Sequence, residues 1–200
     1  MSIYLTARAL SRRLTLARRI CTLRWTVPDR SSAEMAATDL LRATWHDDSG
    51  DCPLPVDPFR IASALGLRVN LMPLEPDVSG MLAKRPYQDP EVYINANDSR
   101  NRQRFSCAHE IGHYDSRASN RDDDSWGYID RRGPSASKGS TPDEIYANQF
   151  AAALLMPEEK VKELHGQIGP AAMAVEFGVS LEAMLFRIDN LDLSRTPQAS

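Results

Sequence analysis

The segment that decides the fold reads His109-Glu110-Ile111-Gly112-His113, inside a stretch that we expect to be helical from Arg102 to Tyr114. Residues four apart on a helix project from one face, one turn above the other. The two imidazoles can therefore hold a single zinc ion, and Glu110, one step further round the helix, can reach a water on that metal. This HExxH arrangement predicts metal-assisted hydrolysis of a peptide bond.

The composition is that of an ordinary globular protein. The chain has 200 residues, of which 42% are hydrophobic and 26% charged, enough for one domain with appendages. No stretch approaches the roughly 18 apolar residues that cross a bilayer, so no membrane partner is expected. The three cysteines, Cys21, Cys52 and Cys107, are odd in number and widely spaced. A disulfide framework is therefore not expected, and a cytoplasmic location is.

The charge is unevenly distributed along the chain. Residues 1–30 carry seven Arg and one Asp, a balance of +6, which leaves −9 for the remainder of the net charge of −3. The acidic main body argues against direct nucleic-acid binding there. We interpret residues 1–30 as a basic, disordered extension. An organelle transit peptide, or a basic arm that contacts nucleic acid or an acidic partner, are the alternatives.

The elements before the HExxH segment predict an α+β fold. A small, mostly antiparallel three-stranded sheet should pack on a zincin-like HExxH helix. We expect a helix from Ser31 to about Trp45, opened by a Ser31–Glu34 capping box. A short helix should follow, opened by Asp57-Pro58 and closed by Gly66. The expected strands are Leu67–Leu71, Met81–Ala83 (after a bend at Val78-Ser79-Gly80) and Glu91–Asn95.

After the HExxH segment, residues 115–140 are polar and predict a long loop, either a lid or mobile. Trp126, Tyr128 and Ile129 suggest that its middle contacts another part of the protein. A helix should start at Thr141-Pro142-Asp143-Glu144 and run to about Met156. Three short helices are expected near Glu158–His165, Pro170–Phe177 and Leu181–Asn190. We divide the chain into a zincin-like metallopeptidase domain at 31–157 and a C-terminal helical subdomain at 158–200, with a disordered tail from about 193.

A third metal ligand has to come from elsewhere in the chain, because catalytic zinc takes three protein ligands. His46 and His165 fit solvated surface positions better. Glu144 begins the downstream helix, and Asn148 lies four residues later on the same side. Asn148 could accept a hydrogen bond from a zinc-bound histidine and fix its tautomer.

A structural role for Glu144 competes with the ligand role. Thr141 and Glu144 have the spacing of a capping box. Asp143 is a further candidate ligand, but the residue four positions later is Ala147, which offers no hydrogen bond.

A family resemblance rests on several runs together: NRQRFSCAHEIGH (101–113), EIYANQFAAALLMP (144–157), PVDPFRIASALGLRV (55–69), VSGML (78–82), and FGVS (177–180) with Ala183-Met184. Over about residues 50–191 the chain resembles the ImmA/IrrE family of zinc metallo-endopeptidases, which pair HExxH with a downstream Glu in the gluzincin manner. The resemblance implies that His109, His113 and Glu144 bind Zn²⁺ and that Glu110 is the catalytic base.

The resemblance also implies a substrate class. Members of that family cleave helix-turn-helix transcriptional repressors, in mobile elements, stress responses and toxin–antitoxin-like modules. We therefore expect a narrow endopeptidase in transcription regulation, with a repressor as protein partner. The alternative is a protein-binding module of the same fold that sequesters its partner without cleaving it. A purely structural zinc site is disfavoured, because such sites have four protein ligands.

Hydrolysis also benefits from a hydrogen-bond donor to the tetrahedral oxyanion. The candidates for this donor are Tyr114, Tyr128, Tyr146 and Arg104. Cys107 lies on another side of the helix from His109 and should be core.

A strand edge and a pair of C-terminal helices are candidate surfaces for binding a partner. A strand such as Met81–Ala83 or Glu91–Asn95 could pair with an extended substrate by edge addition. Residues 174–184 superficially resemble a helix-turn-helix, but 181–190 lacks positive charge, so we interpret the two helices as a packing pair.

Overall fold

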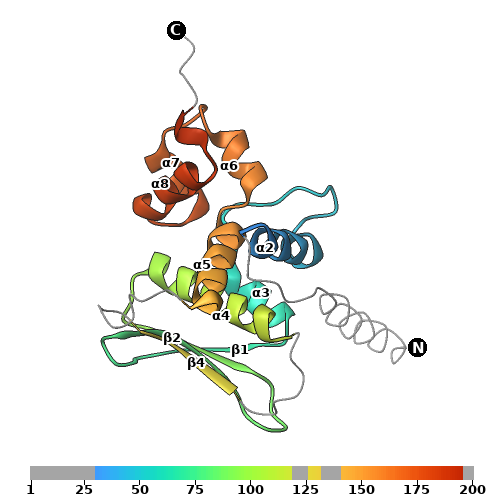
Figure 1. Cartoon of the computed structure of the whole chain (residues 1–200), viewed down its shortest axis with the longest axis vertical. Coiled ribbons are helices and arrows are strands. Elements are labelled where there is room, and N and C mark those ends of the chain that lie inside the picture. The colour runs from blue at the N-terminus through green and yellow to red at the C-terminus, as the bar shows by residue number, and fades with distance from the viewer. Residues whose placement is uncertain (1–29, 119–125, 132–140, 196–200) are drawn as a thin grey trace, which may run out of the picture.

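The computed structural model describes residues 30–118, 126–131 and 141–195, and the basic extension lies almost entirely outside them. A sheet forms one layer, and helices cover one of its faces (Figure 1). The α+β class is therefore confirmed. Within the described ranges, no helix is both long and apolar enough to cross a membrane. The elements in chain order are α2 (Arg30–Thr44), α3 (Pro58–Ala64), β1 (Arg68–Met72), β2 (Val78–Lys84), β3 (Glu91–Asn95), α4 (Arg100–Ala118), β4 (Trp126–Arg131), α5 (Pro142–Leu155), α6 (Glu158–Leu164), α7 (Pro170–Phe177), α8 (Leu181–Asn190) and the 3-10 turn η1 (Leu193–Arg195).

The sheet has four strands in the order β1-β3-β2-β4 and is mixed rather than mostly antiparallel. Strand β2 is antiparallel to both β3 and β4, whereas β1 runs parallel to β3. The fourth strand lies inside the segment predicted as loop. Its aromatic and β-branched residues suit a pleated surface, and its backbone groups pair with β2.

Strands β2 and β3 are interior strands, with a neighbour on each side. The prediction that one of them offers a free edge to substrate is therefore wrong. The predicted bend at 78–80 is also wrong, because β2 already begins at Val78. A register irregularity between Val78 and Gly80 replaces the bend.

Local capping explains why most helices begin and end where predicted. The Asp57 side chain accepts hydrogen bonds from the first backbone N–H groups of α3, with Pro58 in the first turn. Thr141 caps α5 in the same way. Gly178 ends α7 with a φ of 63°, in the left-handed region that favours glycine.

The N-terminal capping box in α2 is wrong. The helix already includes Arg30, and the Glu34 carboxylate pairs with Arg187 of α8. Arg187 Nη1 donates to Glu34 Oε2 at 2.9 Å, and its Nε donates to the carbonyl of Met156 at 2.9 Å. Arg187 is only 3% exposed, so α8 packs on the rest of the protein through this residue.

Helix α4 lies between the sheet and α5, at the centre of the core (Figure 1). Cys107 is fully buried, as predicted. The core cluster contains fully buried apolar side chains of β2, β3, α4 and α5: Leu82, Val92, Ile94, Ile111, Phe150 and Leu154. Packing against the sheet on one side and α5 on the other fixes the directions of the buried side chains of α4.

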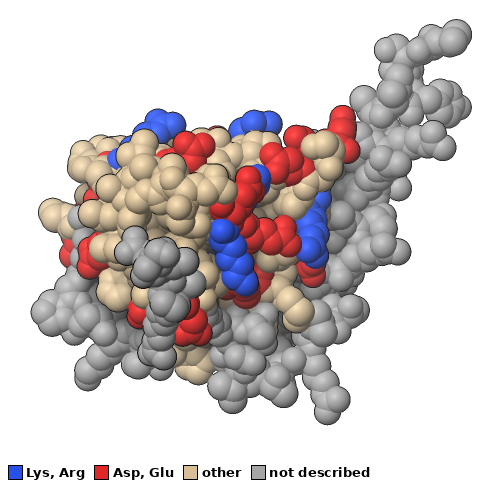
Figure 2. Space-filling view, turned by 90° about the horizontal axis from the view of Figure 1, so that it is seen from above, with Lys and Arg blue, Asp and Glu red and all other residues tan. Residues whose placement is uncertain are grey.

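The described surface carries both signs of charge. Lys160 pairs with Asp51 at 2.7 Å and with Glu163 at 2.9 Å. On the face seen in Figure 2, acidic and basic side chains lie interspersed, with no broad basic area among the described residues. That face does not resemble a nucleic-acid surface.

Candidate metal centre

Three side chains from two helices converge at the amino-terminal end of α5. His109 and His113 come from α4 and Glu144 from α5, and within the described ranges they form a group that could hold a metal ion. Nε2 of His109 lies 3.4 Å from Glu144 Oε2, and Nε2 of His113 lies 3.3 Å from Glu144 Oε1. The two Nε2 atoms are 3.0 Å apart.

These separations fit zinc. Ligand atoms at about 2.0–2.2 Å from a tetrahedral zinc are about 3.3–3.6 Å from one another. The observed separations of 3.0–3.4 Å are close to that edge length. The donor set of two imidazoles and one carboxylate is also that of catalytic sites with a position left for water or substrate.

Glu144 serves in the cap and faces the histidines at once. Its backbone N–H donates to Thr141 Oγ1 at 3.3 Å, while its carboxylate reaches the two imidazoles. Thr141 therefore caps α5 through the Glu144 backbone N–H, whereas the Glu144 carboxylate, which a capping box would turn back to the Thr141 N–H, faces the imidazoles. Hydrogen bonds to His109 and then His113 hold the pKa of Glu144 well below its usual range, against the opposing effect of burial. The site thus favours the ionised, metal-binding form of this carboxylate.

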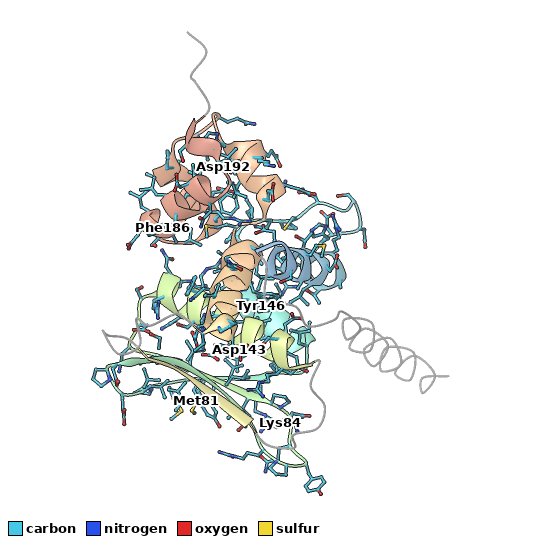
Figure 3. All side chains as sticks on the ribbon, viewed as in Figure 1. Met81, Lys84, Asp143, Tyr146, Phe186 and Asp192 are labelled. Atoms are coloured by element: carbon cyan, nitrogen blue, oxygen red, sulfur yellow. The ribbon has the colours of Figure 1, made fainter. Side chains whose placement is uncertain are left out.

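Asn148 lies one turn after Glu144 and contacts the first histidine. Its Oδ1 is 3.1 Å from His109 Nδ1. With zinc bound, the His109 Nδ1–H would donate to the amide oxygen and Nε2 would offer its lone pair to the metal, in place of the Nε2–H that bonds Glu144 without a metal. Asp143 is not in the metal-binding group, although it lies in the same turn of α5 (Figure 3).

Gly112 brings the two ligand-bearing helices into backbone contact. A Cβ at this position would lie 2.9 Å from Ala147 Cα and 3.2 Å from Phe150 Cβ. Ordinary contacts begin near 3.4 Å, so only glycine fits. The close approach is what allows Glu144 to meet imidazoles from α4.

The candidate base is buried beside the ligands. Glu110 follows His109 on α4 and is fully buried. Its carboxylate lies against Gly80 of β2, the strand that crosses α4. The sequence did not single out Gly80 for a role at the site, because the contact joins residues 30 positions apart.

The candidate oxyanion donors are dispersed. The Tyr146 hydroxyl donates to Asp115 Oδ2 at 2.5 Å, and burial raises the pKa of both groups. Tyr146 lies on α5 beside α4 (Figure 3). Tyr114 is partly buried against the core. Tyr128 belongs to β4, and its side chain lies outside the described part of the protein.

Arg104 holds helices together rather than facing the metal-binding group. Its Nε donates to the carbonyl of Gly178 at 2.9 Å, and its Nη2 donates to the carbonyls of Val56 at 2.7 Å and Phe177 at 3.1 Å. Burial lowers its pKa, yet a guanidinium stays charged. These contacts argue against Arg104 as the oxyanion donor.

Two imidazoles one turn apart, a carboxylate from the next helix and a buried glutamate beside them define a metallopeptidase type of centre. Residues 62–189 match the family model described as the IrrE N-terminal-like domain of the M78 peptidases. The match covers more than half of the chain and includes α4 and α5, so the chain belongs to this peptidase family. The comparison with curated proteins finds no match.

Proposed function

We propose that the protein is a zinc-dependent endopeptidase with a narrow substrate range. The observation that carries the proposal is the convergence of His109, His113 and Glu144, with separations that suit zinc, next to the buried carboxylate of Glu110. A binding module has no need of a base at this position.

The residues divide the chemistry between them. A bound zinc ion supplies Lewis acidity and lowers the pKa of water at the site to about 7. Glu110 would take a proton from water as the water oxygen adds to the peptide carbonyl carbon, and would pass that proton to the amine nitrogen as the C–N bond breaks. Asn148 orients His109 by placing its own Oδ1 atom against Nδ1 of the imidazole. The ionised form of Glu144 completes the ligand set.

The proposed substrate is a helix-turn-helix transcriptional repressor, in a regulatory, mobile-element or toxin–antitoxin-like module or a stress response. What supports this substrate class is the resemblance to the ImmA/IrrE family drawn from the sequence; the family match itself extends to the peptidase class. We also propose a cytoplasmic location. Cys52 and Cys107 are buried thiols rather than partners in a disulfide, which suits a reducing compartment.

Metal analysis tests the first half of the proposal. Purified protein should contain about one zinc per chain, and His113→Ala should lose it. Protein that holds no zinc after purification from zinc-supplemented medium, and takes up none on titration, would refute the proposed metal.

Cleavage tests the second half. Incubation with the repressor encoded beside this gene should give a discrete cut that disappears in Glu110→Gln, which keeps the shape of the side chain but cannot act as a base. Glu182→Gln, on the exposed surface of α8, is the matched control and should cleave normally. Tight binding of the repressor without a cut, with zinc present, would favour the sequestering module instead.

A further inference from the structure

We propose that Gly80 is a positioning residue for Glu110, and that the Ser79-Gly80 pair forms a cradle for the catalytic carboxylate. The inference rests on the proposed function, because it assigns Glu110 as the base. It adds residues of β2 to a site that otherwise comes from α4 and α5.

The carboxylate occupies the space that a side chain at position 80 would fill. A Cβ on Gly80 would lie 2.8 Å from Glu110 Oε1, 3.5 Å from Glu110 Cγ and 3.5 Å from Ile94 Cδ1. Moving Oε1 out to the nearest ordinary contact of 3.4 Å requires a shift of about 0.6 Å. Oε1 is the free end of a flexible side chain, so an added methyl group would displace the buried carboxylate itself rather than the strand.

The strand cannot move away from the carboxylate easily. Gly80 pairs with Ile94 of β3 on one side and with Asp130 of β4 on the other. The register irregularity between Val78 and Gly80 places Ser79 in a bulge at this point. Bulges near active sites commonly re-aim side chains or backbone toward the site.

Helix α4 also holds the bulge. Arg102 donates to Ser79 Oγ from Nε at 3.2 Å and from Nη2 at 3.0 Å, and Ser79 is fully buried. Arg102 precedes Glu110 by eight residues, about two helical turns on α4. The helix that carries the base therefore fixes the strand residue next to Gly80. The gap between Gly80 and Glu110 is set by α4 and β2 together.

Steady-state kinetics on a cleaved substrate tests the cradle. Gly80→Ala should lower kcat by about 10- to 100-fold, because displacements of this size at a reacting group have such effects. KM and zinc content should change little. Gly127→Ala on β4 is the matched control: among the described residues its added Cβ would meet the Leu82 carbonyl alone, at an ordinary 3.4 Å, so kcat should stay at the wild-type value. An unchanged kcat in Gly80→Ala would overturn the proposal.

A double-mutant cycle tests the same contact without any activity. Gly80→Ala should lower Tm by a few degrees when Glu110 is present, because it overpacks a buried contact. In the Glu110→Ala background the same change should lower Tm little or not at all. An equal fall in both backgrounds, or no fall in either, would overturn the proposal. The Tm measurements need no substrate. Absence of cleavage would therefore refute the proposed function, while the double-mutant cycle would still show whether Gly80 contacts Glu110 as proposed.

Discussion

The contact between α4 and α5 at Gly112 gives a sharp prediction. In Gly112→Ala the new Cβ would lie 2.9 Å from Ala147 Cα, so the two helices must separate by about 0.5 Å to restore an ordinary contact. Ala147 lies between Glu144 and Asn148 on α5. The separation therefore moves a metal ligand and the partner of His109 together.

Two opposing effects determine the stability of Gly112→Ala. Overpacking costs about 1–3 kcal/mol, whereas replacing a mid-helix glycine by alanine gains about 1 kcal/mol. The free energy of unfolding should therefore fall by only about 0–2 kcal/mol. Zinc affinity should fall about tenfold or more, as it does when outer partners of metal ligands are disturbed.

Competition with a chromophoric chelator measures the zinc dissociation constant, and thermal unfolding of the zinc-free protein measures stability. Gly127→Ala should match the wild type in zinc affinity, because its methyl group meets only an ordinary contact. The reasoning is refuted if Gly112→Ala binds zinc as tightly as the wild type and has a raised Tm. That result would mean that the helices adjust without moving Glu144.

Three further predictions concern single side chains. Asn148→Ala should weaken zinc binding by about 10- to 100-fold while Asn148→Asp, which keeps an acceptor for His109, retains most of it; chelator competition distinguishes them. Arg104→Met should lower the free energy of unfolding by about 3 kcal/mol or more, measured in urea, because it removes two hydrogen bonds to buried carbonyls and one to the half-buried carbonyl of Gly178; a change below about 1 kcal/mol would contradict the linking role. The pKa of Asp51 lies below its ordinary 3.8, chiefly because of the hydrogen bond from Lys160. The ionised carboxylate therefore stabilises the fold above pH 3.8, and this stabilisation is lost as the pH falls through the lowered pKa. Asp51→Asn should therefore be less stable than the wild type near neutral pH and equally stable in acid, and a difference that persists in acid would contradict the assignment.

Elements whose ends are set by local chemistry could be predicted well from the sequence. Pro170–Phe177, Leu181–Asn190 and Glu91–Asn95 have the predicted bounds. Pro170 at the start and Gly178 after the end set the limits of the first helix, and the Ser180 cap sets the start of the second. Elements that depend on distant partners were missed. Strand β4 exists through its pairing with β2, and Glu34 pairs with a residue 153 positions later rather than with its own helix.

The same division holds for the site. Two histidines four apart are brought together by the helix alone, so sequence spacing predicts their proximity. The position of Glu144 relative to them depends on the α4–α5 contact between Gly112 and Ala147, which lie 35 positions apart in the sequence. The approach of Gly80 to Glu110 carries no local signal, because it depends on the register of β2 and on the Arg102–Ser79 contact.

The hydrogen bonds of the two buried arginines determine how long a segment of the chain is needed to keep the fold intact. Arg104 on α4 needs carbonyls at Val56 and at the end of α7, and Arg187 on α8 needs Glu34. The family match begins only at residue 62, yet two of these acceptors lie before it. A gene rearrangement that exchanged the matched segment alone would leave each guanidinium without some of its acceptors. Natural shuffling or deliberate grafting of this peptidase should therefore succeed only with segments that reach back at least to Glu34.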